Sequence, residues 1–234
     1  MKKNVSMPTS RGPVIHWLTV LFALAASGCG GGGNDTPAPP AAGPAPAPVP
    51  APVPAPPPLP TIAPAVDLDD NHQVGTLFFP DGDTATGGQG NPVSGVPCTD
   101  PHSAFHIHSH LSIFKDGEAL AFPAQVGIVQ LTPTTDCHYF VHTHDHSGKI
   151  HMEAPAPGTF TLGTLFAIWG MPLTSSNVAG ITNVPLTAVY ITENGTVTQF
   201  TGDMATIQMT SHRHIAIVLG TPITQVPFFT WTAN

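Results

Sequence analysis

Apolar and polar residues alternate along most of the chain from residue 103 onward, which is the period-2 pattern of half-buried β-strands. Residues 105–114, FHIHSHLSIF, are followed by Asp116-Gly117 and EALAF, the pattern of a strand, a type I′ turn and a return strand. The segment LTAVYITE, with Asn194-Gly195 and TVTQF after it, repeats this arrangement, and HIAIVLG predicts a further strand. The sequence therefore predicts a sheet built from hairpins.

One segment follows a helical period instead. Its apolar residues recur on one face of a helix: Leu162, Leu165, Phe166 and Trp169. Thr161 precedes them as an N-cap, and Gly170 and Pro172 end the helix. The predicted fold is therefore mostly β, of the α+β class, with an antiparallel sheet or sandwich of hairpins and one short helix near 161–169.

Histidine follows the strand pattern. Eight of the thirteen histidines lie between residues 106 and 151, in a chain with six lysines and arginines. In FHIHSHL, residues 105–111, the side chains of His106, His108 and His110 share one face, because alternate residues of a strand point the same way. The other face is apolar.

Two further polar rows lie on either side of the DHSG turn at 145–148. The first lies on a strand with an apolar opposite face and the second on the return strand: His138, His142 and His144, then Lys149, His151 and Glu153. A two-residue loop at 147–148 places His144 opposite His151. A four-residue loop keeps the same faces together, whereas a three-residue loop turns His151 away. We expect an even loop, because only then do the apolar residues of both segments share one side.

These rows predict a site for a divalent transition metal, because neutral imidazole is a preferred ligand of Zn, Cu(II) and Ni. A solvated polar face that happens to use histidine is the alternative. We expect Zn or Cu(II) and not Cu(I), because the methionines form no Met-rich motif. The expected ligands are His106, His108, His110, His142, His144, His151, Glu153 and His212. Asp145 is expected to hold a ring N–H beside them, and metal affinity to fall as the pH drops through about 6.5.

The first 28 residues are predicted to be a lipoprotein signal peptide. They combine a basic leader with an apolar run too short for a membrane-spanning helix, and end in small residues. LAASGC resembles the lipobox of bacterial lipoproteins, which implies a lipid on Cys29 and, with Gly30 next to it, a place at the outer membrane of a Gram-negative bacterium. On this resemblance the protein belongs to the cell envelope, facing the periplasm or the surface, and contacts the membrane through its lipid alone.

Residues 29–65 are predicted to be a lipidated tether rich in Gly, Pro and Ala. Proline fixes φ and lacks a backbone N–H, so we expect a polyproline II spacer that forms no helix and pairs in no sheet. The remaining residues, 66–234, match the size of one His-rich β domain.

The charge of the chain limits its possible binding partners, and its cysteine content indicates a disulfide. Beyond the leader, fourteen acidic residues stand against three basic ones: Lys115, Lys149 and Arg213. This balance excludes nucleic acid as a partner, since phosphate binding needs clustered Lys and Arg. Cys98 and Cys137 are left as an even pair in an oxidising compartment, and we expect a disulfide between them rather than a thiolate metal site.

Two long motifs carry a resemblance. The segments H-x-H-x-H-L-x-I-F-x-x-G at 106–117 and C-x-Y-x-x-H-T-H-D-x-S-G-x-I-H-x-E at 137–153 resemble those of a group of exported bacterial His-rich proteins, which also share F-T-L-G-x-x-F-x-I-W-G at 160–170. The resemblance runs from about Val93 to Pro222 and carries no activity with it. The resemblance implies that His138 and His146 are accessory. It implies that the following residues belong to the site: His106, His108, His110, His142, His144, Asp145, His151, Glu153 and His212.

The leading hypothesis is an envelope-anchored lipoprotein that binds a divalent transition metal. The first alternative is a metalloenzyme with a three-histidine Zn or Cu site. The H-x-H spacing is similar to that of copper/zinc superoxide dismutases, whose glycine-rich arginine segment is missing here, and to that of carbonic anhydrases, whose chain is much longer. A structural envelope domain is the second alternative. The sequence shows ligands but no substrate-binding element, so no enzyme activity is predicted.

Overall fold

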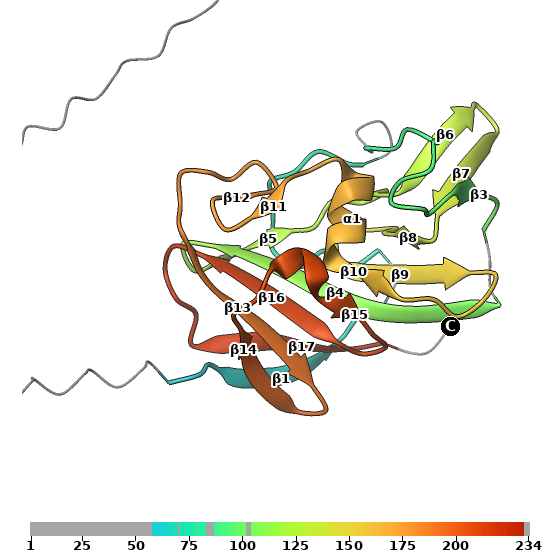
Figure 1. The fold of residues 1–234 in the computed structure, drawn as a ribbon. Helices are drawn as coiled ribbons and strands as arrows, with labels where there is room; N and C mark the ends of the chain where they lie inside the picture. Colours follow the sequence, from blue (N-terminus) through green and yellow to red (C-terminus); the bar gives the residue numbers. More distant parts are fainter. Residues whose placement is uncertain (1–57, 70, 83–86, 102–103, 232–234) are drawn as a thin grey trace, which may run out of the picture. The chain divides into compact units, whose positions relative to one another are not determined.

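The computed structural model describes residues 58–231, except 70, 83–86 and 102–103 (Figure 1). The predicted signal peptide, Cys29 and most of the proline-rich tract lie outside the described residues. Within the described part, no helix is long and apolar enough to cross a membrane.

Strands make up most of the fold, and α1 is the one α-helix among the described residues. The strands in chain order are β1 (Thr61–Asp67), β2 (Thr76–Leu77), β3 (Cys98–Thr99), β4 (Phe105–Lys115), β5 (Glu118–Ala121), β6 (Ile128–Thr132), β7 (Thr135–Tyr139), β8 (Val141–His142), β9 (Lys149–Ala154), β10 (Phe160–Thr161), β11 (Leu173–Thr174), β12 (Asn177–Val178), β13 (Leu186–Glu193), β14 (Thr196–Phe200), β15 (Gln208–Met209), β16 (His214–Leu219) and β17 (Gln225–Thr230). Helix α1 spans Leu162–Trp169, and a 3₁₀ helix, η1, spans Met204–Thr206. The predicted mostly-β fold with one short helix is confirmed.

The largest sheet has the strand order β14-β13-β16-β4-β5-β2. Its long strand β4 is paired along both edges, as Figure 1 shows. The C-terminal half of β4 pairs in parallel with β16 and antiparallel with β5. The N-terminal half pairs antiparallel with β9, and β9 pairs in turn with β8. The parallel pairing of β4 with β16 was not predicted, because the hairpin pattern reports only on strands that follow each other.

Both predicted hairpin turns form. Asp116 and Gly117 have φ angles of 53° and 91° between β4 and β5. Asn194 and Gly195 have φ angles of 50° and 73° between β13 and β14. A type I′ turn needs positive φ at both central residues, which Asn, Asp and Gly tolerate best. These dipeptides therefore fix the two hairpins locally.

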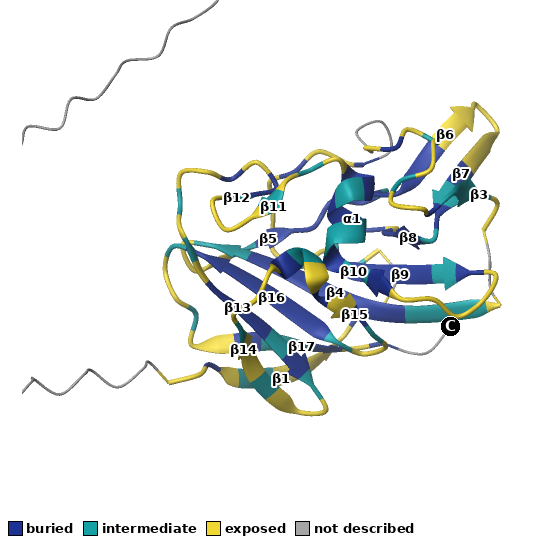
Figure 2. Cartoon of the chain, viewed as in Figure 1, coloured by how far each residue is buried: buried dark blue, intermediate teal, exposed yellow. Residues whose placement is uncertain are grey.

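Helix α1 begins and ends where the sequence predicts. The Thr161 hydroxyl accepts the N–H of Thr164, and Gly170 takes a left-handed φ of 73° at the C-terminus. The buried face of α1 joins one continuous apolar core with the inner face of the sheet (Figure 2). That core includes Leu111 and Ile113 of β4 and the following residues of α1: Leu162, Leu165, Phe166, Ile168 and Trp169.

The first strand begins inside the tract predicted to be an unpaired tether. β1 pairs in parallel with β17, starting with Thr61 opposite Gln225. The prediction that no residue up to 65 pairs in a sheet is therefore wrong for Thr61–Ala65, and the folded domain begins before residue 66. Pro64 lies where the register of the pair shifts, so its missing N–H interrupts no regular ladder.

β17 and the residue after it cover the second face of the main sheet. Val226 packs in an apolar cluster with Ala216 and Val218 of β16. Phe229 and Trp231 are buried further along. The sheet is thus covered on both faces, and its histidine-bearing face is partly enclosed.

A smaller sheet, β3-β7-β6, stands beside the main one. In it, Cys98 and Cys137 form the predicted disulfide, with their Cα atoms 5.3 Å apart. Cys98 lies opposite Tyr139, so the bond ties β3 to β7 next to the pairing that aligns them. This excludes the two thiolates as metal ligands.

Candidate metal centre

Three neighbouring strands bring most of the predicted ligands together. β4 and β9 pair with His106 opposite Glu153 and His108 opposite His151. β8 pairs with the other edge of β9 and places His142 opposite His151. His151 therefore has a histidine across from it on each of its two neighbouring strands.

The pairing of β8 with β9 agrees with a connecting loop that has an even number of residues, as the hydrophobic pattern predicts. The apolar residues of both strands are fully buried on the side away from the histidines: Val141, Ile150 and Met152. The register differs by two residues from that of a two-residue loop, because His142 rather than His144 lies opposite His151. β8 ends at His142, and the next side chain, Thr143, donates its hydroxyl to the Pro123 carbonyl. The backbone N–H of Thr143 donates to the Val126 carbonyl, and the pairing with β9 ends at His142.

Four donor atoms lie close together, one each from His106, His108, His151 and Glu153. Nε2 of His106 lies 3.0 Å from Nε2 of His108, 3.4 Å from Nδ1 of His151 and 3.1 Å from Oε1 of Glu153. Nδ1 of His151 lies 3.0 Å from Nε2 of His108 and 3.4 Å from Oε1 of Glu153. Bonds of about 2.0–2.1 Å to a Zn ion place neighbouring ligand atoms about 3.0 Å apart in octahedral geometry and about 3.4 Å apart in tetrahedral geometry. All five distances fall in this range.

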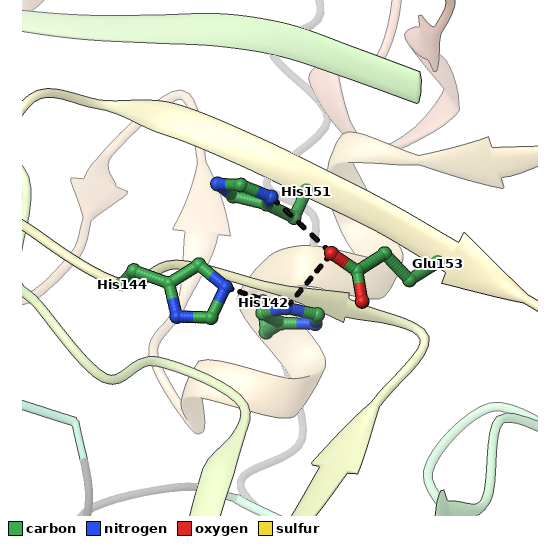
Figure 3. Close-up of side chains that lie close together, drawn as sticks. All are labelled: His142, His144, His151 and Glu153. Atoms are coloured by element: carbon green, nitrogen blue, oxygen red, sulfur yellow. Dashed lines mark hydrogen bonds and ion pairs between the residues drawn. The ribbon is translucent and has the colours of Figure 1, made fainter. Parts of the chain in front are cut away.

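Two more histidines extend the group. Nε2 of His142 lies 3.3 Å from Nε2 of His144 and 3.8 Å from Oε1 of Glu153 (Figure 3). Two sets of ligand atoms each lie within 4.8 Å of one another, and His151 belongs to both. The sets are His142, His144, His151 and Glu153, and His106, His108 and His151. We call these six residues the histidine cluster.

The His142 ring is held in a ligating orientation. Its Nδ1 donates to the Tyr139 carbonyl at 2.8 Å, which leaves Nε2 with a lone pair directed at the cluster. Such a bond to the second nitrogen fixes the tautomer and orients a metal-ligating histidine. The backbone at Tyr139 supplies it, a partner that no sequence motif indicates.

Asp145 does not hold a ring N–H in the described contacts. One carboxylate oxygen accepts the N–H of Ser147 and the other accepts the N–H of Asn71, each at 2.9 Å. Asp145 therefore organises the connection between β8 and β9 rather than a ligand ring. The sequence could not separate these roles, because a carboxylate serves either equally well.

Burial keeps the inner imidazoles neutral. Burial, followed by the charge of neighbouring histidines, lowers the pKa of His108 to about 3 and that of His151 to about 2. Burial also lowers the pKa of His142 well below its ordinary value. A protonated imidazole has no lone pair for a metal, so these three side chains are in the ligating form at neutral pH.

A pocket of about 350 Å³ opens onto the cluster. Its lining combines cluster residues with three others: His106, His144, His151 and Glu153, together with Asn71, Asp145 and Lys149. His144 is exposed at the surface, whereas His108 and His151 are buried. An ion therefore has a route from solvent to the donors. The sequence analysis placed Lys149 in a polar row but assigned it no function, and nothing in the sequence indicated that Asn71 lies at the site.

The structure does not bring His110 into the cluster, contrary to the prediction. Its Nε2 donates to the Ser147 carbonyl at 2.8 Å, and its ring packs on Phe229 with 4.2 Å between centroids. Burial lowers its pKa to about 3, so it is a neutral core histidine. Alternate residues of a strand are about 6.6 Å apart, so the three histidines of β4 span about 13 Å, more than one coordination sphere.

His212 also lies outside the cluster, although it was predicted to be a ligand. Its ring stacks on Trp231 with 5.1 Å between centroids and an interplanar angle of 7°. Its backbone N–H donates to the His108 carbonyl, so it closes the edge of β4 beside the site. His214 is buried opposite His110 in the pairing of β16 with β4.

The two accessory histidines differ. His146 donates Nδ1 to the Phe122 carbonyl at 3.1 Å, and its Nε2 lies 3.4 Å from Asp81, away from the cluster. The His138 ring lies beside the cluster, 5.1 Å from that of His142, with its Nε2 3.6 Å from Asp136.

Comparison with known proteins yields no match. No protein-family description, no curated protein and no solved structure is significantly similar to this chain. The candidate site is therefore argued from its own geometry.

Proposed function

We propose that this protein binds a divalent transition-metal ion, Zn(II) or Cu(II), through the histidine cluster. The observation that carries the proposal is the set of five distances of 3.0–3.4 Å among donor atoms of His106, His108, His151 and Glu153. His106, His108 and His151 form one set of ligand atoms within 4.8 Å of one another, and Glu153 belongs to the second set, with His142, His144 and His151. Imidazole with one carboxylate is a donor set that suits Zn and Cu(II).

We further propose that the binding serves metal capture in the cell envelope. The exposed His144 offers a first contact at the pocket mouth, and the buried donors lie behind it. The lipobox-like sequence around Cys29 supports a lipid anchor, and the acidic composition favours cations near the domain. The anchor then holds the binding domain at the membrane surface.

The test is metal binding by the purified full chain, stripped with a chelator and titrated with Zn(II) in a calorimeter at pH 7.5. The variant His106→Ala/His151→Ala removes the two residues around which the donors gather, and we expect at least a 100-fold loss of affinity, about tenfold for each ligand. The matched control, His72→Ala/His146→Ala, removes two histidines outside the cluster and should bind within about threefold of the unmodified chain.

Equal losses in both double variants would mean diffuse adsorption by surface imidazole. An absence of binding by the unmodified chain, to Zn(II) and to Cu(II) alike, would refute the proposed function.

A further inference from the structure

The donors of the histidine cluster come from both sides of strand β9. His106 and His108 lie on β4, which pairs with one edge of β9, and His142 lies on β8, which pairs with the other edge. Neighbouring strands of a sheet are about 4.8 Å apart, so about 10 Å separates the backbones of β4 and β8 across β9. Donors carried by these two strands therefore start from positions farther apart than one ion spans.

One ion cannot hold all six residues as they are arranged. Bonds of about 2.0–2.1 Å to a Zn ion limit any two of its ligand atoms to a separation of about 4.2 Å. The ligand atoms of the cluster fall into two sets, each within 4.8 Å, rather than into one. The first set is His106, His108 and His151, and the second is His142, His144, His151 and Glu153.

His151 and Glu153 lie where the two sets meet. Nδ1 of His151 contacts the first set, 3.0 Å from Nε2 of His108 and 3.4 Å from Nε2 of His106. Oε1 of Glu153 lies 3.1 Å from Nε2 of His106 in the first set and 3.8 Å from Nε2 of His142 in the second, the contact drawn in Figure 3. A carboxylate has two oxygens and a negative charge, so it can contact two ions and reduce the repulsion between them.

We propose that the cluster binds two divalent transition-metal ions side by side, with the Glu153 carboxylate between them. The first ion is bound by His106, His108 and His151, and the second by His142, His144 and Glu153. The inference rests on the proposed metal function and goes beyond it by assigning a second ion. Both sets contribute to the wall of the pocket of about 350 Å³, so each ion reaches its donors from solvent.

Stoichiometry tests the second ion. The purified full chain, stripped with a chelator, should bind two Zn(II) ions in a calorimetric titration at pH 7.5, the second more weakly because the ions repel each other. His108→Ala removes a donor of the first set alone and His144→Ala a donor of the second alone, so each variant should bind one ion. His72→Ala is the matched control, because His72 pairs with the exposed Asp69 outside the cluster, and it should bind two.

Electron paramagnetic resonance tests whether the two ions are neighbours. Cu(II) ions side by side broaden each other's signal through spin–spin coupling, whereas distant ions give the sum of two isolated spectra. The unmodified chain loaded with two Cu(II) ions should show the coupled spectrum, and His144→Ala loaded with one should show an isolated spectrum. Glu153→Gln keeps the shape of the side chain and removes its charge, so the second binding step should weaken about tenfold.

The outcomes separate the two proposals. A chain that binds neither Zn(II) nor Cu(II) refutes the proposed function and this inference with it. Binding of one ion per chain leaves the proposed function standing and overturns the second ion. Two ions in His108→Ala and in His144→Ala alike overturn the assignment of donors to the two ions.

Two bound Cu(II) ions with an uncoupled spectrum overturn the placement of the ions side by side. An unchanged second step in Glu153→Gln overturns the role of the carboxylate. If His108→Ala or His144→Ala loses its far-UV circular dichroism signal, the stoichiometry and the Cu(II) spectrum of the unmodified chain decide.

Discussion

His108 and His151 face each other across β4 and β9, and 3.0 Å separates Nε2 of the first from Nδ1 of the second. Two buried imidazoles at this distance share one proton between the facing nitrogens when no ion is bound, because two facing lone pairs repel. A metal ion takes the place of that proton, which moves to the other nitrogen of its own ring, and accepts both lone pairs. In the metal-free protein the pair is therefore bridged by a proton, and in the metal-bound protein it is bridged by the ion.

Metal affinity should resist mild acid. The pKa values of about 3 for His108 and about 2 for His151 lie far below 6.5, so protons do not compete for these ligands until the pH falls well below that of an ordinary histidine. We expect less than about a tenfold loss of Zn(II) affinity between pH 7.5 and pH 5.5. Three ordinary imidazoles would lose about tenfold each over this range. Chelator competition at the two pH values distinguishes the cases, and a loss near 1,000-fold would contradict the buried geometry.

The metal-free fold should lose stability in acid through His110. Its folded pKa of about 3 lies below the unfolded value near 6.5, so between these values the unfolded chain binds a proton that the folded chain excludes. The free energy of unfolding should therefore fall as the pH drops below 6.5, by about 1.4 kcal/mol per pH unit for this residue. Urea unfolding with a chelator present, between pH 6 and pH 4, should show a shallower slope for His110→Gln. His72→Gln, at a side chain 35 % exposed, serves as the control, and parallel slopes for all three chains would contradict the assignment.

The disulfide should support the fold without supporting the site. Cys98 and Cys137 are 39 residues apart, and closing a loop of about 40 residues stabilises a protein by roughly 4 kcal/mol in the chain-entropy account. Cys98→Ala/Cys137→Ala should lower the free energy of unfolding by about that amount, as measured with urea. Zn(II) affinity should stay within about threefold, because the ligands lie on β4, β9 and residues 142–144, and the β3-β7-β6 sheet contributes only the Tyr139 carbonyl that accepts the His142 ring N–H. A collapse of metal affinity in a folded variant would show that the small sheet positions the ligands.

The lipid anchor is a separate prediction. Cys29→Ser removes the thiol that a lipidated N-terminus requires, so the protein should move from the membrane fraction to the soluble envelope fraction on cell fractionation. The metal affinity of the released protein should equal that of the anchored one. An unchanged membrane fraction for Cys29→Ser would remove the lipoprotein proposal and leave the metal site untouched.

Local signals predict the local part of this fold. The turn dipeptides Asp116-Gly117 and Asn194-Gly195 specify their hairpins because positive φ restricts the choice of residue. The start and end of α1 follow from Thr161 and Gly170 in the same way. The pairings of β4 with β16 and of β1 with β17 join segments far apart in the chain, and no local propensity encodes them.

The sequence predicted which strand faces carry the histidines of the candidate site, but not which of these histidines lie close enough to share an ion. Alternation placed His106, His108 and His110 together, and the apolar back of β9 set the parity of His151. Which histidines meet depends on register and on what covers the face. Phe229 and the Ser147 carbonyl engage His110, and both come from outside its strand. A pattern of alternate residues reports neither.

The long strand β4 has a consequence for how the protein folds. Its N-terminal half must pair with β9 before the donors of the cluster meet, and its other edge is completed only by β16 and the backbone at His212, near the end of the chain. Contacts so distant in sequence form slowly, because loop-closure entropy is lost before they contribute. Among the described strands, no single hairpin carries both His108 and His151, so we expect an ion to have little affinity for partly paired chains. At a concentration 1,000 times its dissociation constant, an ion bound by the native state alone adds about 4.1 kcal/mol to the free energy of unfolding. For a protein with the proposed metal site, the metal supply therefore sets the fraction of molecules that are folded at equilibrium.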